Sequence, residues 1–333
     1  MDAVELTKKL LEIDSSKDEM ELLCFIEDLL RENGAEVKRL PVGEKFNLLA
    51  TKNNVKEGIL LCGHCDTVPT EKHYEPHINE GKLFGIGASD MKSGLAVCIA
   101  SFLSSKSDVG LMVTVEEETT FAGAKALTKE MVEGFSYAIV AEPTNLKIYD
   151  RQYGLAGFKI NLKGEQRHTA NIHEGVHPVN LLVRKLSKFL TTFKEEFPES
   201  IAAINQIEAG YKMNVIPSQA SGWIDVRVSP SDSLDRVKNL IRDNFEAEFV
   251  TLHEPVCAKI SPLNKNLKEV SEERFVFRGF TEMYFYEMLG LDTVILGPGL
   301  MEKAHEKNEY VPVENIKRFE DMLTKICRRT PRE

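Results

Sequence analysis

The stretch GILLCGHCDTVP, residues 58–69, passes from an apolar run into a turn that carries polar side chains. A short apolar run bounded by turn residues is typical of a strand buried inside a sheet. His64 and Asp66 follow this run directly. Because open α/β sheets bind ligands at the carboxyl ends of their strands, the stretch predicts a buried strand that delivers both side chains to a site.

Predicted strands and helices alternate on both sides of this stretch. We expect helices where apolar residues recur with helical period, and strands where short apolar or β-branched runs stand between turns. The helices are expected at 4–33, 92–103 and 123–131, and the strands at 36–40, 46–51, 58–62, 111–115 and 137–141. This alternation predicts an α/β domain with a mostly parallel sheet.

The middle of the chain has a different order of elements. The expected order is a strand at 157–162, a helix at 178–193, strands at 202–208 and 219–228, a helix at 234–245 and a strand at 248–252. This β-α-β-β-α-β order is that of a ferredoxin-like α+β domain. Strand–helix alternation resumes near residue 270. We therefore expect a catalytic domain in two segments, 1–152 and 255–333, with an inserted lid domain over 153–254.

The composition disfavours several classes of protein. The 333 residues carry a formal net charge of −10, which disfavours a nucleic-acid partner because phosphates require a basic face. No apolar run reaches the roughly 20 residues that a membrane span needs, so we expect no membrane association. Charged residues interrupt the first apolar positions, which argues against a signal peptide. The six cysteines show no disulfide framework, so the sequence predicts a cytoplasmic protein with reduced thiols.

Four more segments place side chains that bind metals after predicted strands or turns. They supply Asp90 in the segment 87–92, the run Glu116–Glu118, Glu142, and His305 in the segment 304–309. Each has an ordinary alternative: a helix cap, a solvated acidic loop, a loop glutamate or a hydrogen-bonded histidine. Together with His64 they provide two histidines and at least three carboxylates without a thiolate. That set suits a catalytic zinc or cobalt site.

The segments 63–69, 85–92, 117–118, 142–143 and 305–309, in this order, resemble those of the two-zinc aminoacylase and exopeptidase family, peptidase family M20. The resemblance covers nearly the whole chain. It implies a zinc-exopeptidase-like catalytic domain with two Zn²⁺ ions, for which Co²⁺ can substitute. The implied ligands are His64, Asp90 and Glu142 on one ion, and Glu118, His305 and the bridging Asp90 on the other.

The same resemblance assigns two further roles near the ligands. Glu116, Glu117 and Glu118 compete for the role of general base, and the family's Glu-Glu-Thr pattern is matched when Glu117 takes it. Asp66 would orient the ring of His64, because a carboxylate on the second ring nitrogen of a ligating histidine fixes its tautomer.

The inserted domain also resembles the lid of this family. His168 in the segment 166–170 would bind the oxyanion of the scissile carbonyl, Asn214 belongs to an asparagine motif, and Arg227 would bind the substrate carboxylate. The alternatives are an exposed loop histidine, a turn asparagine and a surface arginine. Thr281 and Gly299 of the catalytic domain would line the substrate site.

The lid also predicts a partner. Lid dimers are common in the resembled family, and a β-α-β-β-α-β unit has an edge strand suited to pairing. We therefore expect a homodimer in which His168 reaches into the partner's active site.

The implied reaction is hydrolysis of the amide bond of a small N-acyl amino acid. The segment Phe280–Phe285 is similar to the Thr-Glu segment of acetylornithine deacetylases, so acetylornithine is the leading substrate. Succinyl-diaminopimelate, a carrier-protein-linked lysine or ornithine, and the substrates of dipeptidases and carboxypeptidases stay open. Two features depart from the family: Ser93 replaces a usual glycine, and the interval from His64 to Asp90 is shorter than in most of its deacetylases.

Two other functions compete with this interpretation. The tetrad Cys62-Gly63-His64-Cys65 spells the motif of a thiol–disulfide oxidoreductase. A reactive thiolate of that kind lies at a helix amino terminus, however, and Cys62 ends a predicted strand. The second competitor is a metal-free binding protein on the same scaffold, which the complete set of ligand types disfavours.

Overall fold

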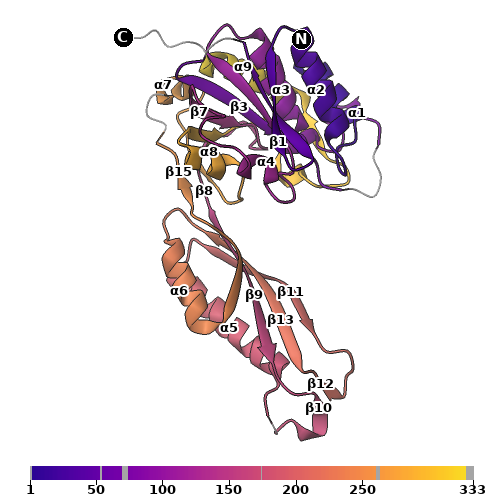
Figure 1. Ribbon diagram of the computed structural model, residues 1–333, viewed down its shortest axis with the longest axis vertical. Coiled ribbons are helices and arrows are strands. Elements are labelled where there is room, and N and C mark those ends of the chain that lie inside the picture. Colours follow the sequence, from indigo (N-terminus) through magenta and orange to yellow (C-terminus); the bar gives the residue numbers. More distant parts are fainter. Residues whose placement is uncertain (1, 53–54, 70–73, 174, 260–262, 328–333) are drawn as a thin grey trace. The chain divides into compact units, whose positions relative to one another are not determined.

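The computed structural model describes residues 2–52, 55–69, 74–173, 175–259 and 263–327. Two units make up the chain. The first comprises Met1–Asp150, Ala258–Val276 and Thr281–Glu333, and the second comprises Arg151–Cys257 and Phe277–Phe280. Figure 1 accordingly shows the N-terminal part of the chain, in indigo and purple, and the C-terminal part, in yellow, within one unit.

A mixed β-sheet in the order β1-β2-β6-β3-β7-β17-β8 forms the centre of the first unit. The four strands β6, β3, β7 and β17 are parallel, whereas β1, β2 and β8 join antiparallel. Their bounds are β1 Glu36–Val42, β2 Lys45–Thr51, β3 Gly58–His64, β6 Val109–Thr114, β7 Phe135–Val140, β8 Tyr149–Gln152 and β17 Asp292–Ile295. The predicted α/β fold with a mostly parallel central sheet is confirmed.

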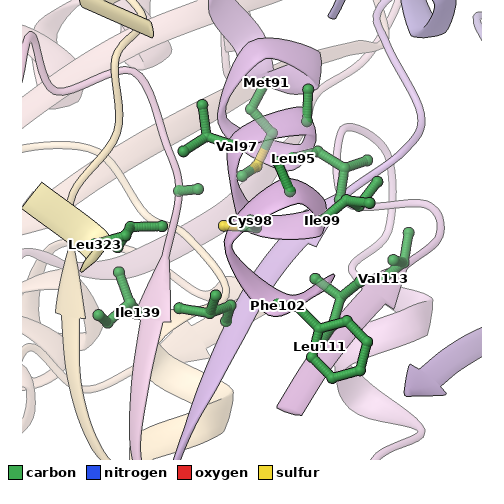
Figure 2. Packing of buried hydrophobic residues seen from close by; sticks show 14 of the residues in the cluster. Met91, Leu95, Val97, Cys98, Ile99, Phe102, Leu111, Val113, Ile139 and Leu323 are labelled. Carbon is green, nitrogen blue, oxygen red and sulfur yellow. The ribbon is translucent and has the colours of Figure 1, made fainter. Parts of the chain in front are cut away.

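Helices cover both faces of this sheet, so its central strands are hydrophobic on both sides. Alternate residues of β3 separate accordingly, because successive side chains of a strand point to opposite faces. Leu61 belongs to the core that includes α3 and α9, and Leu60 and Cys62 belong to the smaller core that includes Tyr286 of α8. Figure 2 shows the α3 side, where Leu95, Val97, Cys98, Ile99 and Phe102 pack near Leu111, Val113, Ile139 and Leu323.

The helices of the first unit differ from the prediction in two places. Their bounds are α1 Ala3–Glu12, α2 Met20–Glu32, α3 Ser93–Ser104, α4 Ala122–Lys125, α7 Asn264–Lys268, α8 Met283–Leu289 and α9 Val313–Ile326. The single helix expected at 4–33 was wrong, because Ile13 leaves α1 in extended conformation and the Asp18 carboxylate accepts a hydrogen bond from Met20 N–H as α2 begins.

The helix expected at 123–131 was also wrong beyond its first turn. α4 ends at Lys125, and hydrogen bonds that span three residues then form turns up to Phe135. These turns bury Leu127 and Val132 against the smaller core while the chain returns to β7. No helix within the described ranges is long and apolar enough to cross a bilayer.

Short strands complete the first unit and mark the passages to the second. β4 His77–Asn79, β5 Lys82–Phe84 and β18 Tyr310–Pro312 form a separate antiparallel sheet. β8 pairs with β15 Val256–Cys257 and with β16 Phe275–Phe277, where the chain passes from one unit to the other.

The second unit is a four-stranded antiparallel sheet with two helices. The sheet has the order β11-β13-β9-β14, and the chain runs β9 Gly154–Lys163, α5 Pro178–Glu196, β11 Ile201–Ala209, β13 Gln219–Val228, α6 Leu234–Asn244 and β14 Ala247–His253. Phe158, Phe189 and Phe245 form the centre of its core. A ribbon of β10 Arg167–His168 and β12 Val215–Ile216 is added to it. The order is the ferredoxin-like one that the sequence predicts.

Candidate metal centre

Three neighbouring parallel strands bring most of the predicted site residues to one edge of the central sheet. His64 is the last residue of β3, Glu117 and Glu118 follow β6, and Glu142 follows β7. β3 pairs with both β6 and β7 in parallel register. Their carboxyl ends therefore meet at the edge where α/β sheets bind ligands.

Two tight turns supply the remaining ligand types. Asp90 lies in a kinked turn, Ala88–Lys92, that precedes α3, has non-helical backbone angles at Asp90 and Met91, and contains a cis peptide bond between these two residues. This turn begins at Gly87, whose φ of 83° favours glycine and whose added Cβ would lie 2.6 Å from Thr67 Cγ2. His305 has a φ of 65° in the loop that follows the 3₁₀ turn Met301–Lys303.

The ligand atoms form two groups that share Asp90. His64, Asp90 and Glu142 make one group, and Asp90, Glu118 and His305 make the other, with all atoms of a group within 4.8 Å of one another. Asp90 presents Oδ1 to His64 Nε2 and Oδ2 to His305 Nε2, each at 3.4 Å. His305 Nε2 also lies 3.0 Å from Glu118 Oε1. Each oxygen of Asp90 therefore faces a different histidine, as a bridging ligand requires.

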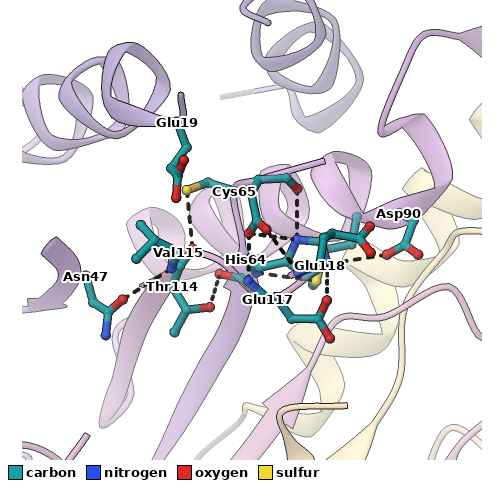
Figure 3. Close-up of polar contacts among 12 residues, drawn as sticks. Glu19, Asn47, His64, Cys65, Asp90, Thr114, Val115, Glu117 and Glu118 are labelled. Atoms are coloured by element: carbon teal, nitrogen blue, oxygen red, sulfur yellow. Dashed lines mark hydrogen bonds and ion pairs between the residues drawn. The ribbon is translucent and has the colours of Figure 1, made fainter. Parts of the chain in front are cut away.

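A third group overlaps the first. Glu117 and Glu118 lie within the same 4.8 Å limit of His64, and Glu117 Oε2 is 4.0 Å from His64 Nε2. Figure 3 shows both glutamates beside His64 with Asp90 next to them. Glu117 is buried, so its carboxylate is directed into the cluster rather than into solvent.

Three buried atoms of the first group fit a bound cation. His64 Nε2, Asp90 Oδ1 and Glu142 Oε1 have no hydrogen-bond partner among the described residues. A buried polar atom without a partner costs about 1–3 kcal/mol, and a charged one costs more. His64 Nδ1 is 3.0 Å from the Asp66 carbonyl oxygen, so this nitrogen donates, and in the neutral ring Nε2 offers its lone pair to a metal. A single cation would satisfy all three atoms.

The charges of the cluster act strongly on one another. Burial and neighbouring carboxylates raise the pKa of Glu117 and of Glu142 well above the ordinary value. The carboxylates of Asp90 and Glu118 raise the pKa of His305 to about 10, and carboxylates outweigh burial to raise the pKa of His64. The two histidines hold the pKa of Asp90 low despite its burial. In the metal-free protein, protons and imidazolium charges balance the carboxylates that a divalent cation would otherwise balance.

Asp66 lies beside the His64 ring, as predicted, and also makes contacts that were not predicted. The main-chain carbonyl of Asp66 makes the hydrogen bond to His64, and its carboxylate Oδ1 lies 3.6 Å from His64 Nδ1. The carboxylate accepts hydrogen bonds from the N–H groups of Glu117, at 3.1 Å, and Glu118, at 3.0 Å. Asp66 therefore joins the end of β3 to the loop that carries the predicted base.

Sequence reasoning missed two other supports of this loop. The Asn47 side-chain oxygen accepts the Val115 N–H at 3.2 Å, and its amide donates to the Gly123 carbonyl at 2.9 Å. Lys45 forms ion pairs with the buried Glu19 at 2.9 Å and with Glu116 at 3.0 Å. No motif marks Asn47 or Lys45, because both act through contacts distant in the sequence.

Thr281 and Gly299, predicted to contact substrate, have packing roles in the first unit. Thr281 is buried, and its hydroxyl accepts a hydrogen bond from Met283 N–H at the start of α8. A Cβ on Gly299 would lie 2.1 Å from the Ser89 carbonyl oxygen, so only glycine lets the loop approach the Asp90 turn. Gly94 in α3 also has no room for a side chain, because a Cβ there would lie 2.2 Å from the Ala141 carbonyl oxygen.

The predicted site residues of the second unit do not all lie together. His168 pairs with Val215, and the Asn214 carbonyl accepts the Thr169 N–H at 3.1 Å, so His168 and Asn214 lie side by side. Arg227 lies near the far end of β13, roughly 26 Å along the strand from its first residue. Its guanidinium bonds to the Asp225 carboxylate at 2.7 and 3.3 Å.

The Cys62–Cys65 motif lacks the environment of a redox pair. Both thiols are buried and free, and burial raises the pKa of each well above the ordinary value. Redox-active thiols need the opposite shift, which a helix amino terminus supplies. The geometry therefore opposes the oxidoreductase interpretation.

An α/β sheet with one histidine at a strand end, a second in a nearby loop and several carboxylates around them has the arrangement typical of a metal-dependent hydrolase. The family model described as peptidase family M20/M25/M40 matches residues 60–329. The chain therefore belongs to this family of hydrolases.

Individual relatives agree with this assignment. The chain is 27% identical to an acetylornithine deacetylase of Photorhabdus laumondii, with 91% of this chain and 88% of the relative covered. It is 25% identical to an acetylornithine deacetylase of Buchnera aphidicola, covering 88% and 86%.

Solved structures show the same fold. A tripeptidase from Staphylococcus aureus matches with a TM-score of 0.87 at 19% identity, covering 98% of this chain and 96% of that one. An M20 family metallo-carboxypeptidase from Sulfolobus solfataricus matches with a TM-score of 0.79 at 16% identity, covering 98% and 99%.

Proposed function

We propose that this hydrolase is a zinc-dependent amidohydrolase that cleaves an N-acyl amino acid into a carboxylate and a free amino acid, with acetylornithine as the leading substrate. One observation carries the proposal: three buried ligand atoms, which find no hydrogen-bond partner in the described part of the chain, converge beside the carboxylate of Glu117. The two relatives named acetylornithine deacetylase, each matched over most of its length, support the choice of substrate.

The proposed centre holds two zinc ions, for which cobalt can substitute. His64, Asp90 and Glu142 would hold one ion, and Glu118 and His305 would hold the other, with Asp90 shared. Imidazole and carboxylate ligands without thiolates are typical of catalytic rather than structural zinc. When bound, the ions supply a Lewis acid for the scissile carbonyl and lower the pKa of water.

The residues of the chain move the proton. Glu117 accepts a proton from the attacking water as the oxygen–carbon bond forms at the amide carbonyl. It then gives that proton to the amine nitrogen as the carbon–nitrogen bond breaks, so that the products are a carboxylate and an amino acid. Hydrogen bonds from Glu117 N–H and Glu118 N–H to Asp66 hold the loop in place while the side chain of Glu117 transfers the proton. His168 would bind the developing oxyanion.

Peptide hydrolysis is the second candidate function. The same centre can attack a peptide carbonyl, and solved structures of this fold include the tripeptidase and the metallo-carboxypeptidase described above. Desuccinylation and hydrolysis of a carrier-linked lysine or ornithine use the same chemistry on a different acyl group. The contacts that choose among these substrates are therefore the ones to test.

A substrate panel with zinc-reconstituted protein tests the proposal. The panel contains acetylornithine, acetylcitrulline, acetyllysine, succinyl-diaminopimelate and simple dipeptides, and kcat/KM is measured for each. We expect acetylornithine to have the highest value. The Glu117→Gln protein, prepared identically, controls for contaminating hydrolases. A higher value for dipeptides would replace the deacetylase proposal with a dipeptidase, and inactivity on the whole panel would contradict both.

We also propose that the second unit pairs two copies of the chain. β11 is an edge strand of its sheet and exposes Ile201 and Ile207 at 42% and 50%. Val183 of the neighbouring α5 is exposed at 54%. Exposed edge strands with apolar residues are sites where another chain can add. In the proposed homodimer, His168 of one protomer completes the active site of the other.

Complementation tests this dimer. The Glu117→Gln and His168→Ala variants should each be nearly inactive alone. After they are unfolded together and refolded, about half of the dimers should be mixed, and each mixed dimer has one site with both residues intact. About a quarter of wild-type activity should return. No recovery in dimers shown to be mixed would place His168 in its own chain's site, and a monomer in solution would exclude the dimer.

A further inference from the structure

Glu309 lies four residues after His305, between that ligand and β18, and its side chain is turned inward. It is 2% exposed. Its carboxylate accepts three main-chain hydrogen bonds, from Gly87 N–H to Oε2 and from Ser89 N–H and Asp90 N–H to Oε1, each at 2.8 Å. The side chain therefore holds the turn that presents Asp90.

Other contacts join the same two loops. The Ser89 hydroxyl donates to the Tyr310 carbonyl at 2.8 Å and accepts the Leu300 N–H at 3.0 Å. Gly85 N–H donates to the Glu309 carbonyl at 3.2 Å. Glu309 differs from these contacts because it alone among them bonds to the main chain of Asp90 itself.

The chemistry of these bonds requires a carboxylate. Three N–H groups point at one side chain, and an ionised carboxylate offers two oxygens with lone pairs for all of them. Hydrogen bonds to a charged acceptor are roughly twice as strong as neutral ones. A glutamine at this position has one acceptor oxygen, and its NH₂ group would face an N–H donor.

Asp90 is the residue for which position matters most. Its two oxygens face different histidines, and each belongs to a different ligand group. A small rotation of its main chain therefore displaces both oxygens, and each ligand group loses its position for one of them. The Asp90 N–H bond to Glu309 restrains that rotation. Because Glu309 and His305 belong to one short loop, the loop that supplies a ligand of the second group also orients the ligand shared by both.

We propose that Glu309 is a positioning residue that sets Asp90 between the two ligand groups, an inference that rests on the proposed metal centre. Its effect is on the occupancy of the centre rather than on the reacting atoms. Residues that orient metal ligands typically change metal affinity or activity by about 10- to 100-fold when substituted. Loss of Glu309 should weaken the binding of zinc by a factor in this range.

Zinc affinity, measured by competition with a chromophoric chelator, tests the proposal without an activity assay. The variants are Glu309→Gln, Glu309→Asp and the matched control Glu306→Gln, whose exposed carboxylate pairs with Lys303 in the same loop. We expect about 10- to 100-fold weaker binding in Glu309→Gln, an intermediate loss in Glu309→Asp, which keeps the charge on a shorter arm, and wild-type affinity in the control.

Two further measurements separate positioning from general stability. The melting temperature of each metal-free variant reports the fold, and the absorption spectrum of the cobalt-loaded protein reports ligand geometry. A changed cobalt spectrum in folded Glu309→Gln supports the proposal; if that variant does not fold, the affinity and spectrum of Glu309→Asp decide in its place. Wild-type affinity and spectrum in a folded Glu309 variant would overturn it. Failure of the wild-type protein to bind zinc would instead overturn the proposed function.

Discussion

The two units of this chain bury different kinds of side chain. The core of the second unit is hydrocarbon, built around Phe158, Phe189 and Phe245, and among its described residues it buries no carboxylate. The first unit has a larger apolar core but also buries a cluster of ionisable side chains at the edge of its sheet: His64, Asp66, Asp90, Glu117, Glu142, Glu282 and Glu309.

Because of this difference, the apolar packing that stabilises the fold can be distinguished from the buried charges that carry the proposed function. Apolar burial stabilises a fold under almost any solution condition, by about 25 cal/mol for each Å² removed from water. Buried charges cost several kcal/mol each unless partners or a cation compensate them. We therefore expect the stability of the first unit to depend on metal and pH, and the stability of the second unit to depend on neither.

Metal removal should produce the largest effect. A chelator should abolish hydrolysis, and added zinc or cobalt should restore it, because the ligand atoms of the cluster then regain their cation. The single tryptophan, Trp223, lies on β13 in the second unit, so its fluorescence follows that unit during heating. Chelation should lower the melting transition seen by circular dichroism and leave the Trp223 transition in place. Full activity in metal-free protein would contradict the proposed centre.

Substitutions in the Glu116–Glu118 run should separate base from ligand. Glu117→Gln should lose about 10²- to 10⁴-fold in turnover, the usual scale for a general base, while keeping its zinc. Glu118→Gln should lose zinc, since Glu118 belongs to the group with His305. Glu116→Gln is the matched control, because Glu116 pairs with Lys45 outside the cluster. Zinc content and kcat are measured together, and exchanged phenotypes would move the base to position 118.

Truncation of one aromatic ring in each core should sharpen the comparison. Phe189→Ala should lower the stability of the second unit by about 3–5 kcal/mol, the usual cost of a deleted buried ring, and lower the Trp223 transition. Its zinc affinity should equal that of wild type. Phe102→Ala, the matched change under α3, should lower the transition of the first unit instead. Weakened zinc binding in Phe189→Ala would show that the units are not energetically separate.

The sequence predicted the strands well, and also which side chains the strand ends bring together, because both follow from short-range patterns. Apolar runs mark β3, β6 and β7, and parallel neighbours must end at the same edge, so His64 and Glu142 come together without knowledge of loop geometry. The ferredoxin-like order of the second unit was predictable for the same reason. The break between α1 and α2 was not, because helical period continues through a segment that local turn hydrogen bonds interrupt.

The supports of the site could not be predicted from such patterns. Glu309 stood inside a recognised segment, but its role depends on three main-chain N–H groups more than 200 positions earlier. Asp66 was expected to contact the His64 imidazole, and its carboxylate does lie 3.6 Å from it, but the hydrogen bonds of that carboxylate with the main chain of Glu117 and Glu118 were not predicted. Contacts to main-chain atoms depend on how the loops fold. Because nearly every residue type offers the same main-chain groups, the identity of the partner residue does not predict such a contact. Side-chain types therefore predict the chemistry of the site, whereas the geometry of the loops decides which side chains hold the site in place.

A substitution of Glu282 should have the smallest effect, and it tests the buried charges of the first unit most specifically. It is fully buried, and neither of its carboxylate oxygens accepts a hydrogen bond of good geometry from a described residue. The hydroxyl of Tyr286, which is also buried, likewise makes no such hydrogen bond with a described residue. Burial raises the pKa of Glu282 to about 7 from its ordinary value of 4.5, against the attraction of His64.

Glu282→Gln should therefore stabilise the metal-free protein at high pH. Between pH 4.5 and 7 the folded chain keeps a proton that the unfolded chain has released, so wild-type stability falls as pH rises through this window and the loss is complete above it. Glutamine carries no charge and avoids that loss. At pH 8 the variant should gain up to about 3 kcal/mol over wild type, at roughly 1.4 kcal/mol per pKa unit, and at pH 4.5 almost nothing. Urea denaturation at both pH values measures this, with Glu272→Gln, an exposed site, as control. An equal gain at both pH values would mean that packing, not charge, sets the effect.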